Sequence, residues 1–533
     1  MRIAWISPSP LLPTGLGKVT NYLTQGLAKR GFRVFIGNPQ YAGQPLEINS
    51  VIHYPIVESN HIPRFLRAVK PDVVVVYASH WVPPYNRIAE ICQKLNLRTL
   101  FYVTVEFSSL SVHFIRPLIG VNFIATPSQY GKKVMVEHGI PEDRILVVPH
   151  GVDTRIFRPF EARFEGFDDF FIYGMVARNN LRKEFPVVIR AFAQLPDEVK
   201  ESSLLYLHTS PVEENITLTG SVRGWNINIL TAKYGLIGKV LLPSDADKWW
   251  GVPEHELAQI YNALDVYCHA SSGEGFGLPV LEAMACGKPV IASNNTAIPE
   301  IVGDAGILVP CHEEDIETAE GFTVATTKIK PFSDAMAKLY YDENLRRTLS
   351  QRALERAKQF TWKRAIDLIE KAIYLALEHP RLGPEILRFS KPILSDTNQG
   401  MFSKYIPRGK GLALDIGSGK LCLAKRVLEE KGYNYVSLDV RSSRRVMVVG
   451  DARYLPFRDR AFDFVWCNQV LEHIPTEDQL RVVEEARRVG KHGCIIYPSE
   501  SLDCYWYDPD HKQISCGVKK ISEIKEGFYV LRW

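Results

Sequence analysis

The sequence lacks the residue patterns that mark several large classes of protein. Its nine cysteines are scattered over 533 residues, with no C-x-x-C pair and no Cys/His group at zinc spacing, so we predict no metal site. An odd, dispersed set of cysteines is typical of reduced thiols in the cytoplasm. No apolar run approaches the ~20 residues that a membrane-spanning helix requires. The net charge of +4 is small for this length, which gives no support for nucleic-acid binding.

The first residues also lack the features of a signal peptide. The run MRIAWISPSPLLPTG has one basic residue, and its apolar part is broken by prolines. It is typical of a first β-strand that enters a loop. We therefore expect a cytoplasmic protein.

Length and patterning predict about three α/β domains. An apolar strand at 2–7, a loop rich in proline and glycine at 8–17, a helix at 18–30 and a strand at 32–37 begin a doubly wound domain. Continuous apolar strands such as 72–77 indicate a parallel sheet with helices on both faces.

We place the domain limits where this patterning changes. The first domain is predicted at 1–165, the second at 166–378, and a linker with four prolines and three glycines at 379–410. The third domain, 411–533, is predicted to have one trimmed βα unit, and its aromatic tail, 503–533, indicates a closing β-hairpin.

The stretch 271–287, SSGEGFGLPVLEAMACG, is the richest in chemistry. It follows a strand, and its glycines free the backbone to approach a ligand closely. Pro279 suits the first turn of a helix, whose amides would face an anion. With Glu274 in the loop and Glu282 about one turn into the helix, the stretch predicts a site for a phosphorylated, hydroxyl-rich ligand.

A basic pair, Arg178 and Lys183, follows the strand near 170–176. Open α/β sheets bind ligands at this end of their strands. A solvated charged loop is the alternative. Arg182 and Lys248 lie nearby in the sequence without a strong claim.

The run E-G-F-G-L-P-V-L-E resembles the E-x7-E signature of retaining GT-B glycosyltransferases of the family 4 type. The resemblance covers about 1–378 and implies two Rossmann-like domains with the donor between them, joined again by a helix at 361–378. It makes Glu274, Arg178 and Lys183 the candidate catalytic residues, with the two cations on the donor diphosphate. It places Glu282 on the ribose hydroxyls. Further donor contacts would come from Gly275, Phe276, Gly277 and Leu278.

In the first domain the resemblance is weaker. The run T-G-L-G at 14–17 matches the loop that approaches the donor phosphates through Gly15 and Gly17, although an ordinary turn is the alternative. Glu106 is the acceptor-side candidate, because the usual His-Asp type pair is absent after the strand at 99–105. Glu300 looks like an acid near the donor pocket, with a helix-start acid as the alternative. Two histidines, His80 and His113, are weaker candidates.

The third domain resembles class I methyltransferases that use S-adenosylmethionine. L-D-I-G-S-G-K resembles their first motif, and G-D-A-R-Y-L-P-F continues into a run that matches their third and fourth motifs. The resemblance implies that Asp439 binds ribose hydroxyls, and that Asn468 and Gln469 face the methyl-transfer site. The other candidate cofactor contacts are Asp415, Gly417, Gly419, Asp451 and Ala452.

These observations favour a hexosyl-type glycosyltransferase that moves a sugar from a UDP- or GDP-linked donor to a glycan, lipid or protein acceptor, with retention of configuration. We expect no metal and no nucleic-acid partner, and a peripheral membrane contact stays open. The methyltransferase-like domain either uses S-adenosylmethionine or is a non-catalytic docking module. A sugar-nucleotide epimerase or a phosphorylase on the same two-domain architecture is the other alternative.

Overall fold

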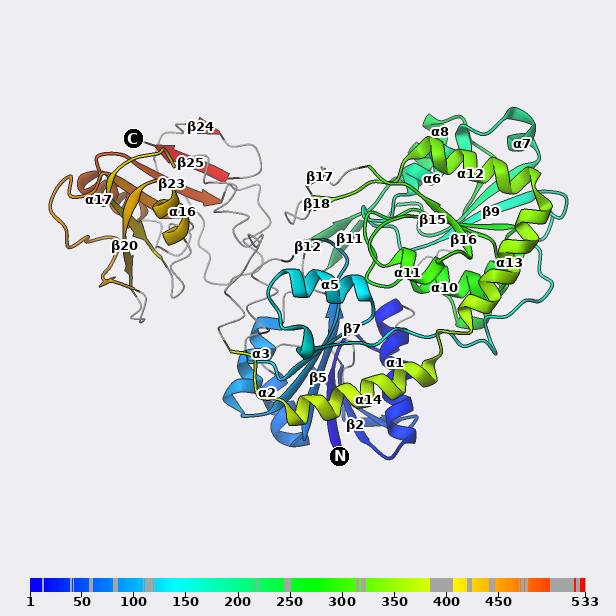
Figure 1. Ribbon diagram of the computed structural model, residues 1–533, viewed down its shortest axis with the longest axis horizontal. Helices are drawn as coiled ribbons and strands as arrows, with labels where there is room; N and C mark the ends of the chain where they lie inside the picture. Colours follow the sequence, from blue (N-terminus) through cyan, green and yellow to red (C-terminus); the bar gives the residue numbers. More distant parts are fainter. Residues whose placement is uncertain are drawn as a thin grey trace. The chain divides into compact units, whose positions relative to one another are not determined.

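The computed structural model divides the chain into two units, which we describe separately (Figure 1). The first unit contains residues 1–215 and 222–393, and the second contains 216–221 and 394–533. The described residues are 1–383, 406–498, 522–523 and 528–532, with gaps at 12–13, 39–40, 42, 57–60, 80–84, 109, 111–117, 119, 213, 218–219, 244–250, 313–315, 318–322, 419–423, 441–445, 469, 471–473 and 475–477. None of the helices formed by these residues combines the length and apolar character that a membrane crossing requires.

An eight-stranded sheet forms the N-terminal part of the first unit. Its order is β3-β4-β2-β1-β5-β6-β7-β8, and its neighbours are parallel except for β3 and β4. Helices α1 and α14 pack on one face, and α2, α3 and α5 on the other, so the central strands are buried apolar runs. The strands are β1 (Arg2–Ile6), β2 (Arg33–Asn38), β3 (Leu46–Ile48), β4 (Val51–Pro55), β5 (Val73–Ser79), β6 (Arg98–Thr104), β7 (Phe123–Thr126) and β8 (Ile145–Val147), and the helices are α1 (Gly15–Lys29), α2 (His61–Val69), α3 (Tyr85–Lys94), α5 (Gln129–Glu137) and the 3-10 helix Glu142–Arg144.

A six-stranded, fully parallel sheet follows in the same unit. Its order is β13-β10-β9-β14-β15-β16. Two doubly wound parallel sheets of this kind confirm the predicted fold of the first two domains. The strands of this sheet are β9 (Phe171–Val176), β10 (Ser203–His208), β13 (Val240–Leu241), β14 (Val266–His269), β15 (Val290–Ser293) and β16 (Gly306–Val309), and the helices are α6 (Phe185–Ala193), α7 (Asp197–Glu201), α8 (Ile227–Lys233), α9 (Glu254–Ala263), α10 (Leu278–Ala285), α11 (Ile298–Val302), α12 (Ile329–Tyr341) and α13 (Glu343–Ala357). Two further pairs of strands are β11 (Glu214–Thr217) with β12 (Gly220–Arg223), whose residues 216–221 belong to the second unit, and β17 (Ile316–Glu317) with β18 (Thr323–Val324).

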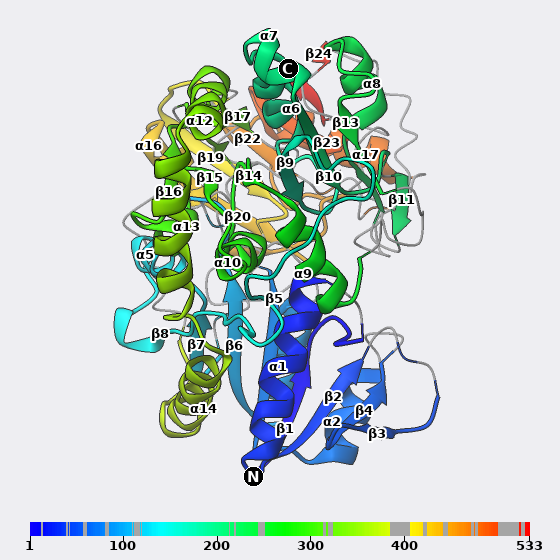
Figure 2. The same ribbon diagram turned by 90° about the vertical axis from the view of Figure 1, so that its right-hand side faces the viewer.

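Helix α14 (Trp362–Glu378) follows the second sheet in sequence but packs against the first. Figures 1 and 2 show it beside the strands of that sheet. Thr361 caps the helix through the Arg364 amide, at 3.2 Å, and the ring of Trp362 stacks on Tyr22 at 4.4 Å between centroids. The chain therefore passes back to its first domain after completing the second.

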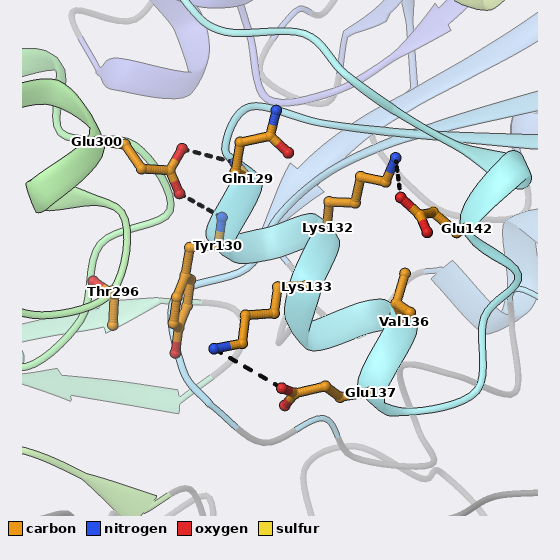
Figure 3. Close-up of a pocket in the computed structure, with 9 residues that line it drawn as sticks. All are labelled: Gln129, Tyr130, Lys132, Lys133, Val136, Glu137, Glu142, Thr296 and Glu300. Carbon is orange, nitrogen blue, oxygen red and sulfur yellow. Dashed lines mark hydrogen bonds and ion pairs between the residues drawn. The ribbon is translucent and has the colours of Figure 1, made fainter.

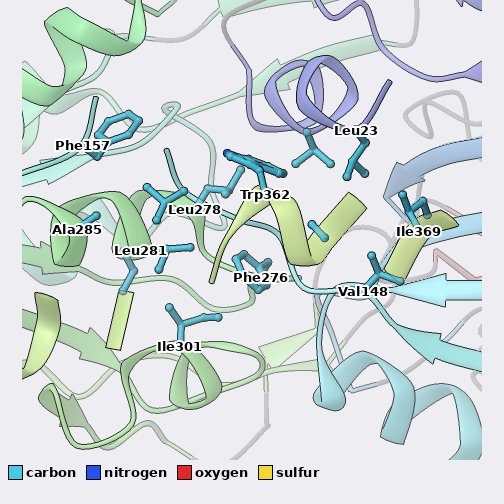
Figure 4. Close-up of a cluster of buried hydrophobic side chains, with 14 of the residues drawn as sticks. Leu23, Val148, Phe157, Phe276, Leu278, Leu281, Ala285, Ile301, Trp362 and Ile369 are labelled. Carbon is cyan, nitrogen blue, oxygen red and sulfur yellow. The ribbon is translucent and has the colours of Figure 1, made fainter. Parts of the chain in front are cut away.

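One apolar core runs through both sheets of the first unit. Figure 4 shows Leu23 of α1, Trp362 and Ile369 of α14, and Phe276 and Leu278 of the glycine-rich loop and the helix that follows it, within one cluster of buried side chains. Because the loop itself supplies core residues, its backbone is fixed by packing as well as by hydrogen bonds.

The second unit contains a seven-stranded sheet of order β21-β20-β19-β22-β23-β25-β24. Its strands are parallel except at the end, where β25 is antiparallel to both β23 and β24. The antiparallel β24–β25 pair lies within the predicted closing hairpin. The segment 441–449, on which the prediction of a trimmed βα unit depends, lies partly outside the described residues. The elements are β19 (Gly411–Ile416), α16 (Ala424–Glu430), β20 (Tyr433–Asp439), β21 (Val448–Val449), β22 (Phe464–Asn468), α17 (Gln479–Val489), β23 (Gly493–Pro498), β24 (Ser522–Glu523) and β25 (Phe528–Arg532).

Candidate functional site

The glycine-rich loop joins β14 to α10 and is pressed against the first domain. A Cβ atom on Gly273 would lie 2.2 Å from the Glu106 carbonyl oxygen, and one on Gly275 would lie 2.6 Å from the Cβ of Thr104. Gly277 adopts a φ of 111°, which favours glycine, and precedes α10 as its N-cap. We expected the glycines to make room for a ligand. In the structure Gly273 and Gly275 make room for the neighbouring domain.

Glu274 is the centre of a buried charge cluster. Its Oε1 accepts a hydrogen bond from Lys183 Nζ, and lies 3.0 Å from an Arg182 guanidinium nitrogen and 3.1 Å from His269 Nε2. Burial opposes ionisation, but Arg182 and Lys183 outweigh it and hold the pKa of Glu274 well below its usual range. The carboxylate is therefore ionised at neutral pH.

Arg182, which the sequence offered only as a residue without a strong claim, contacts Glu274 directly. Besides Glu274, its guanidinium contacts Glu106, at 3.4 Å, and donates to the Gly273 carbonyl. It thereby ties the loop to the end of β6 in the first domain. Its position directly before Lys183 was the only signal in the sequence that it belongs to the site. The spacing of the basic residues in this segment does not indicate which of them points toward Glu274.

Arg178 was predicted to pair with Lys183. The structure places it directly after β9, exposed to solvent, whereas the cations on Glu274 are Arg182 and Lys183. The role of Arg178 on a donor diphosphate stays a prediction. Lys248 lies outside the described residues.

Glu282 lies on α10 and faces the first domain. Its Oε1 accepts from Lys18 Nζ, and its Oε2 accepts from the Tyr261 hydroxyl at 3.0 Å. Lys18 comes from the first turn of α1 and also contacts Glu254 at 3.1 Å. Burial raises the pKa of Glu282, although Lys18 and Tyr261 act in the opposite direction. Lys18 was also missed, although it directly follows the predicted glycine loop.

The T-G-L-G run at 14–17 was predicted to be a loop, but in the structure Gly15–Gly17 form the first turn of α1 and Thr14 is its N-cap. Thr14 caps α1 by accepting from the Gly17 amide at 3.1 Å. A Cβ on Gly15 would lie 3.7 Å from Leu278 Cδ1, which is an ordinary van der Waals distance. The structure thus brings the start of α1 close to the start of α10, and a donor that contacts both stays a prediction.

Glu106, the acceptor-side candidate, is buried at the end of β6. Ser79 donates to its Oε1 at 3.4 Å, and Arg182 contacts its Oε2. The carboxylate therefore lies in the same cluster as Glu274. His80 and His113, the weaker candidates, lie outside the described residues.

Glu300 connects the two domains at a second place. It lies on α11, and its carboxylate accepts from the backbone amides of Gln129, at 2.8 Å, and Tyr130, in the first turn of α5. Figure 3 shows these contacts at the edge of a cavity of about 470 Å³, which is also lined by Lys132 and Lys133. Glu300 is thus a cap for a helix of the other domain, favoured by the positive end of the helix dipole.

In the second unit, Asp415 lies near the end of β19 and Gly417 directly follows that strand. Asp415 is buried and accepts from the Tyr435 hydroxyl at 2.7 Å, and burial raises its pKa to about 7. Gly417 has a φ of 70°, and a Cβ there would lie 2.3 Å from Val470. Asp439 ends the neighbouring strand, β20. Gly419 and Gln469 lie outside the described residues, as does the side chain of Asn468.

Asp451 is paired within its own turn. Arg453 binds it through a guanidinium nitrogen at 2.7 Å and also contacts Asp478 at 2.7 Å. Ala452, between them, is buried. The carboxylate that was predicted to flank an adenine therefore already has a cationic partner.

Three parts of the chain match models of known protein families. Residues 13–156 match the model for Glycosyltransferase Family 4, 229–356 that for Glycosyl transferases group 1, and 412–497 that for a Methyltransferase domain. The first unit has GT-B glycosyltransferase domains of the family 4 type. The second unit has a methyltransferase-type domain. Both predicted resemblances are confirmed at this level.

The curated relatives include glycosyltransferases of bacteria. O-antigen chain mannosyltransferase B of Escherichia coli is 26% identical over 271 residues, 49% of this chain and 61% of the relative. A D-inositol 3-phosphate glycosyltransferase of Stackebrandtia nassauensis is 28% identical over 258 residues, 45% of this chain and 51% of the relative. The chain thus spans between half and two thirds of the length of these relatives.

Solved structures share the GT-B fold. Sucrose-phosphate synthase of Thermosynechococcus elongatus matches with a TM-score of 0.55 and 19% identity, over 70% of this chain and 98% of the other. Anabaena HepE in complex with UDP-glucose matches with a TM-score of 0.55 and 15% identity, over 70% and 99%. Within the described residues, no group of three or more His, Cys, Asp or Glu side chains is arranged to hold a metal ion.

Proposed function

We propose that the GT-B domains transfer a hexosyl group from a UDP- or GDP-linked sugar to a glycan, lipid or protein acceptor, with retention of configuration. The observation that carries the proposal is that the segment 273–282 meets the first domain at two charged places: Glu274 and its two cations beside Glu106, and Glu282 on Lys18 at the start of α1. The charge cluster lies at the carboxyl ends of β9 and β14, where open α/β sheets bind nucleotides. The glycosyltransferase relatives support the same reaction class.

The departing diphosphate needs positive charge in a dry site. Lys183 is buried and its Nζ now pairs with Glu274, so a phosphate oxygen that reached it would take over part of this contact. The first turn of α10 adds backbone amides at the positive end of a helix dipole. We assign Lys183, with Arg178 and Arg182, to the diphosphate.

The ribose would bind at Glu282. Tyr261 fixes Oε2, so Oε1 is the oxygen left for ribose hydroxyls, and at present it accepts from Lys18. Donor binding therefore exchanges an ion pair between the domains for hydrogen bonds to the nucleotide.

Glu274 stays ionised in this proposal and accepts from donor-sugar hydroxyls rather than acting as a nucleophile. Its anionic charge would also stabilise positive charge that develops on the sugar ring as the diphosphate leaves. Transfer on the same face of the sugar gives retention. Glu106, in the same cluster, is the candidate that receives the acceptor's proton.

A screen of UDP-, GDP- and ADP-sugars for donor hydrolysis tests the proposal. Glu282→Ala and Lys183→Ala should each lower hydrolysis at least tenfold, because each removes a charged contact of ~1.5–3 kcal/mol. Lys330→Ala is the matched control, since Lys330 forms an exposed pair with Asp334. Undiminished hydrolysis in both site variants would refute the assignment.

If a lipid proves to be the acceptor, sedimentation with vesicles tests for the peripheral membrane contact that such an acceptor requires.

A second candidate function, methyl transfer, concerns the second unit. The sheet order with its reversed β25, the Gly417 turn and the position of Asp439 at the end of β20 fit S-adenosylmethionine, whereas the pairing of Asp451 with Arg453 does not favour its adenine. When bound, that cofactor supplies an electrophilic methyl group; Asp439 would accept from its ribose. Calorimetric titration of the full chain tests this function. Absence of binding at millimolar cofactor would favour a docking module.

A further inference from the structure

Glu184 is a buried carboxylate that the proposed chemistry does not use. It directly follows Lys183 and precedes α6 as its N-cap, but its side chain does not cap that helix. The carboxylate instead accepts from Thr327 just before α12, from its hydroxyl at 2.6 Å and from its backbone amide at 3.3 Å. Within the described part of the chain, no lysine, arginine or histidine forms an ion pair with Glu184.

From Thr327 a chain of hydrogen bonds leads to the glycine-rich loop. The Thr327 and Ser293 hydroxyls are 2.6 Å apart, and the Ser271 amide donates to Ser293 Oγ at 3.0 Å. All three residues are at most 2% exposed. Ser271 is the first residue of the loop that carries Glu274. This series of hydrogen bonds therefore ends at the donor loop.

The charge on Glu184 sets the direction of this chain. An ionised carboxylate only accepts, so the Thr327 hydroxyl must donate to it. Thr327 Oγ then accepts from the Ser293 hydroxyl, and Ser293 Oγ keeps a lone pair for the Ser271 amide. Ser293 Oγ also lies 3.4 Å from the His269 carbonyl, but a hydroxyl that donated there would leave the 2.6 Å contact with Thr327 without a donor. One direction therefore fits the short contacts. The positive end of the α6 dipole favours the charge that imposes this direction.

The backbone of Glu184 is joined to the same loop. Its amide donates to the Ala270 carbonyl at 3.1 Å, and the Ser272 amide donates to the Arg182 carbonyl at 3.0 Å. Lys183 and Ser271 form the antiparallel bridge between these two bonds. Glu184 therefore lies where the cationic segment and the donor loop are held together.

We propose that Glu184 is a positioning residue for the donor site, which fixes Ser271 through Thr327 and Ser293 and fixes Lys183 through its own backbone. This inference rests on the proposed function, since it assumes that the loop and Lys183 bind a nucleotide diphosphate. The hydrogen bonds of Thr327, just before α12, would then hold in place residues that do not themselves contact the donor. Burial raises the pKa of Glu184 to about 7, so near neutral pH the carboxylate is ionised in only part of the molecules, and the hydrogen-bond direction described above belongs to the ionised form.

A pair of substitutions at Thr327 tests the inference through binding of UDP and GDP. Thr327→Val keeps the shape and removes the hydroxyl, and should weaken nucleotide binding about tenfold, the effect of losing a buried hydrogen bond of ~1.4 kcal/mol. Thr327→Ser keeps the hydroxyl and should bind within about twofold of the unaltered protein. Thr348→Val is the control, because Thr348 donates within exposed α13. Binding is measured by calorimetry, and melting temperatures are measured in parallel.

Glu184→Gln provides a second variant of nearly unchanged volume. This substitution removes the negative charge that sets the direction of the hydrogen bonds from Glu184 to Ser271. It should therefore weaken nucleotide binding severalfold. A lower melting temperature with unchanged nucleotide affinity, in both Thr327→Val and Glu184→Gln, would overturn the inference and leave the proposed function intact. If the unaltered protein binds neither UDP nor GDP, the proposed donor site and the inference both fail.

Discussion

Removing the amine of Lys18 should destabilise the protein in a manner that depends on pH. Lys18→Met leaves Glu282 with Tyr261 as its remaining partner, while Glu282 stays buried at 4% side-chain exposure. A buried carboxylate without its cation takes up a proton instead of staying charged. Glu254, the other partner of Lys18, is 27% exposed, so water replaces much of what it loses.

The magnitude follows from the cost of that proton. Each pH unit above the ordinary pKa of 4.5 costs about 1.4 kcal/mol when Glu282 is protonated in the folded state and ionised in the unfolded state. The loss is then at most about 3 kcal/mol at pH 7 and about 1 kcal/mol at pH 5. A folded-state pKa above the unfolded value makes stability fall as pH rises, so the penalty grows from pH 5 to pH 7. Lys18→Met also removes the free-energy cost of burying the Lys18 ammonium group. This gain makes the net loss of stability smaller than the figures above.

Calorimetric melting at pH 5, 6 and 7 measures the effect. Combining Lys18→Met with Glu282→Gln should recover most of the loss at pH 7, because no buried carboxyl then has to be protonated. Lys330→Met, at an exposed ion pair, serves as the control and should change little at any of these pH values. A penalty that is equal at pH 5 and pH 7, or that persists in the double variant, would refute the reasoning.

Three further predictions concern other contacts of the described residues. Gly273→Ala should lower the melting temperature markedly, because its Cβ would lie 2.2 Å from a backbone oxygen, whereas Gly15→Ala, with 3.7 Å of room, should be tolerated; comparative calorimetry decides. Glu300→Ala should cost about 1 kcal/mol, measured by urea denaturation, because the Gln129 and Tyr130 amides of α5 lose their carboxylate acceptor while the N-cap Ser128 remains. Arg453→Ala should strengthen S-adenosylmethionine binding about fivefold in titration calorimetry by freeing Asp451; unchanged or weaker binding would show that the pair does not compete with the cofactor.

Much of the fold was predictable because buried parallel strands leave long apolar runs in the sequence. The strand, glycine loop and helix around Glu274 were placed correctly. The loop before α1 was predicted to end at residue 17, whereas the helix begins at Gly15. The turn at Gly417 also has the positive φ that favours glycine.

Side-chain partners were harder to predict, because they depend on contacts between distant segments. Lys18 and Glu282 are 264 positions apart, and no local pattern connects them. The inward turn of Arg182 depends on pairing of its segment with 270–272, which periodicity does not report. Likewise, Gly273 was interpreted as space for a ligand because the neighbouring Glu106 carbonyl cannot be foreseen from sequence.

The return of α14 determines which pieces of this chain can be expected to fold alone. Ile369, Ile373 and Ala376 of α14 are fully buried in the core that contains β1, β5 and β6. A fragment that ended near residue 160 would contain all eight strands of the first sheet, yet would expose the apolar face that α14 covers. Leu382, whose amide and carbonyl bond to Val121 and Gly120, extends the requirement beyond the helix. A truncated protein made to study the first domain should therefore carry residues 361–383 as well, supplied on the same chain or as a separate peptide.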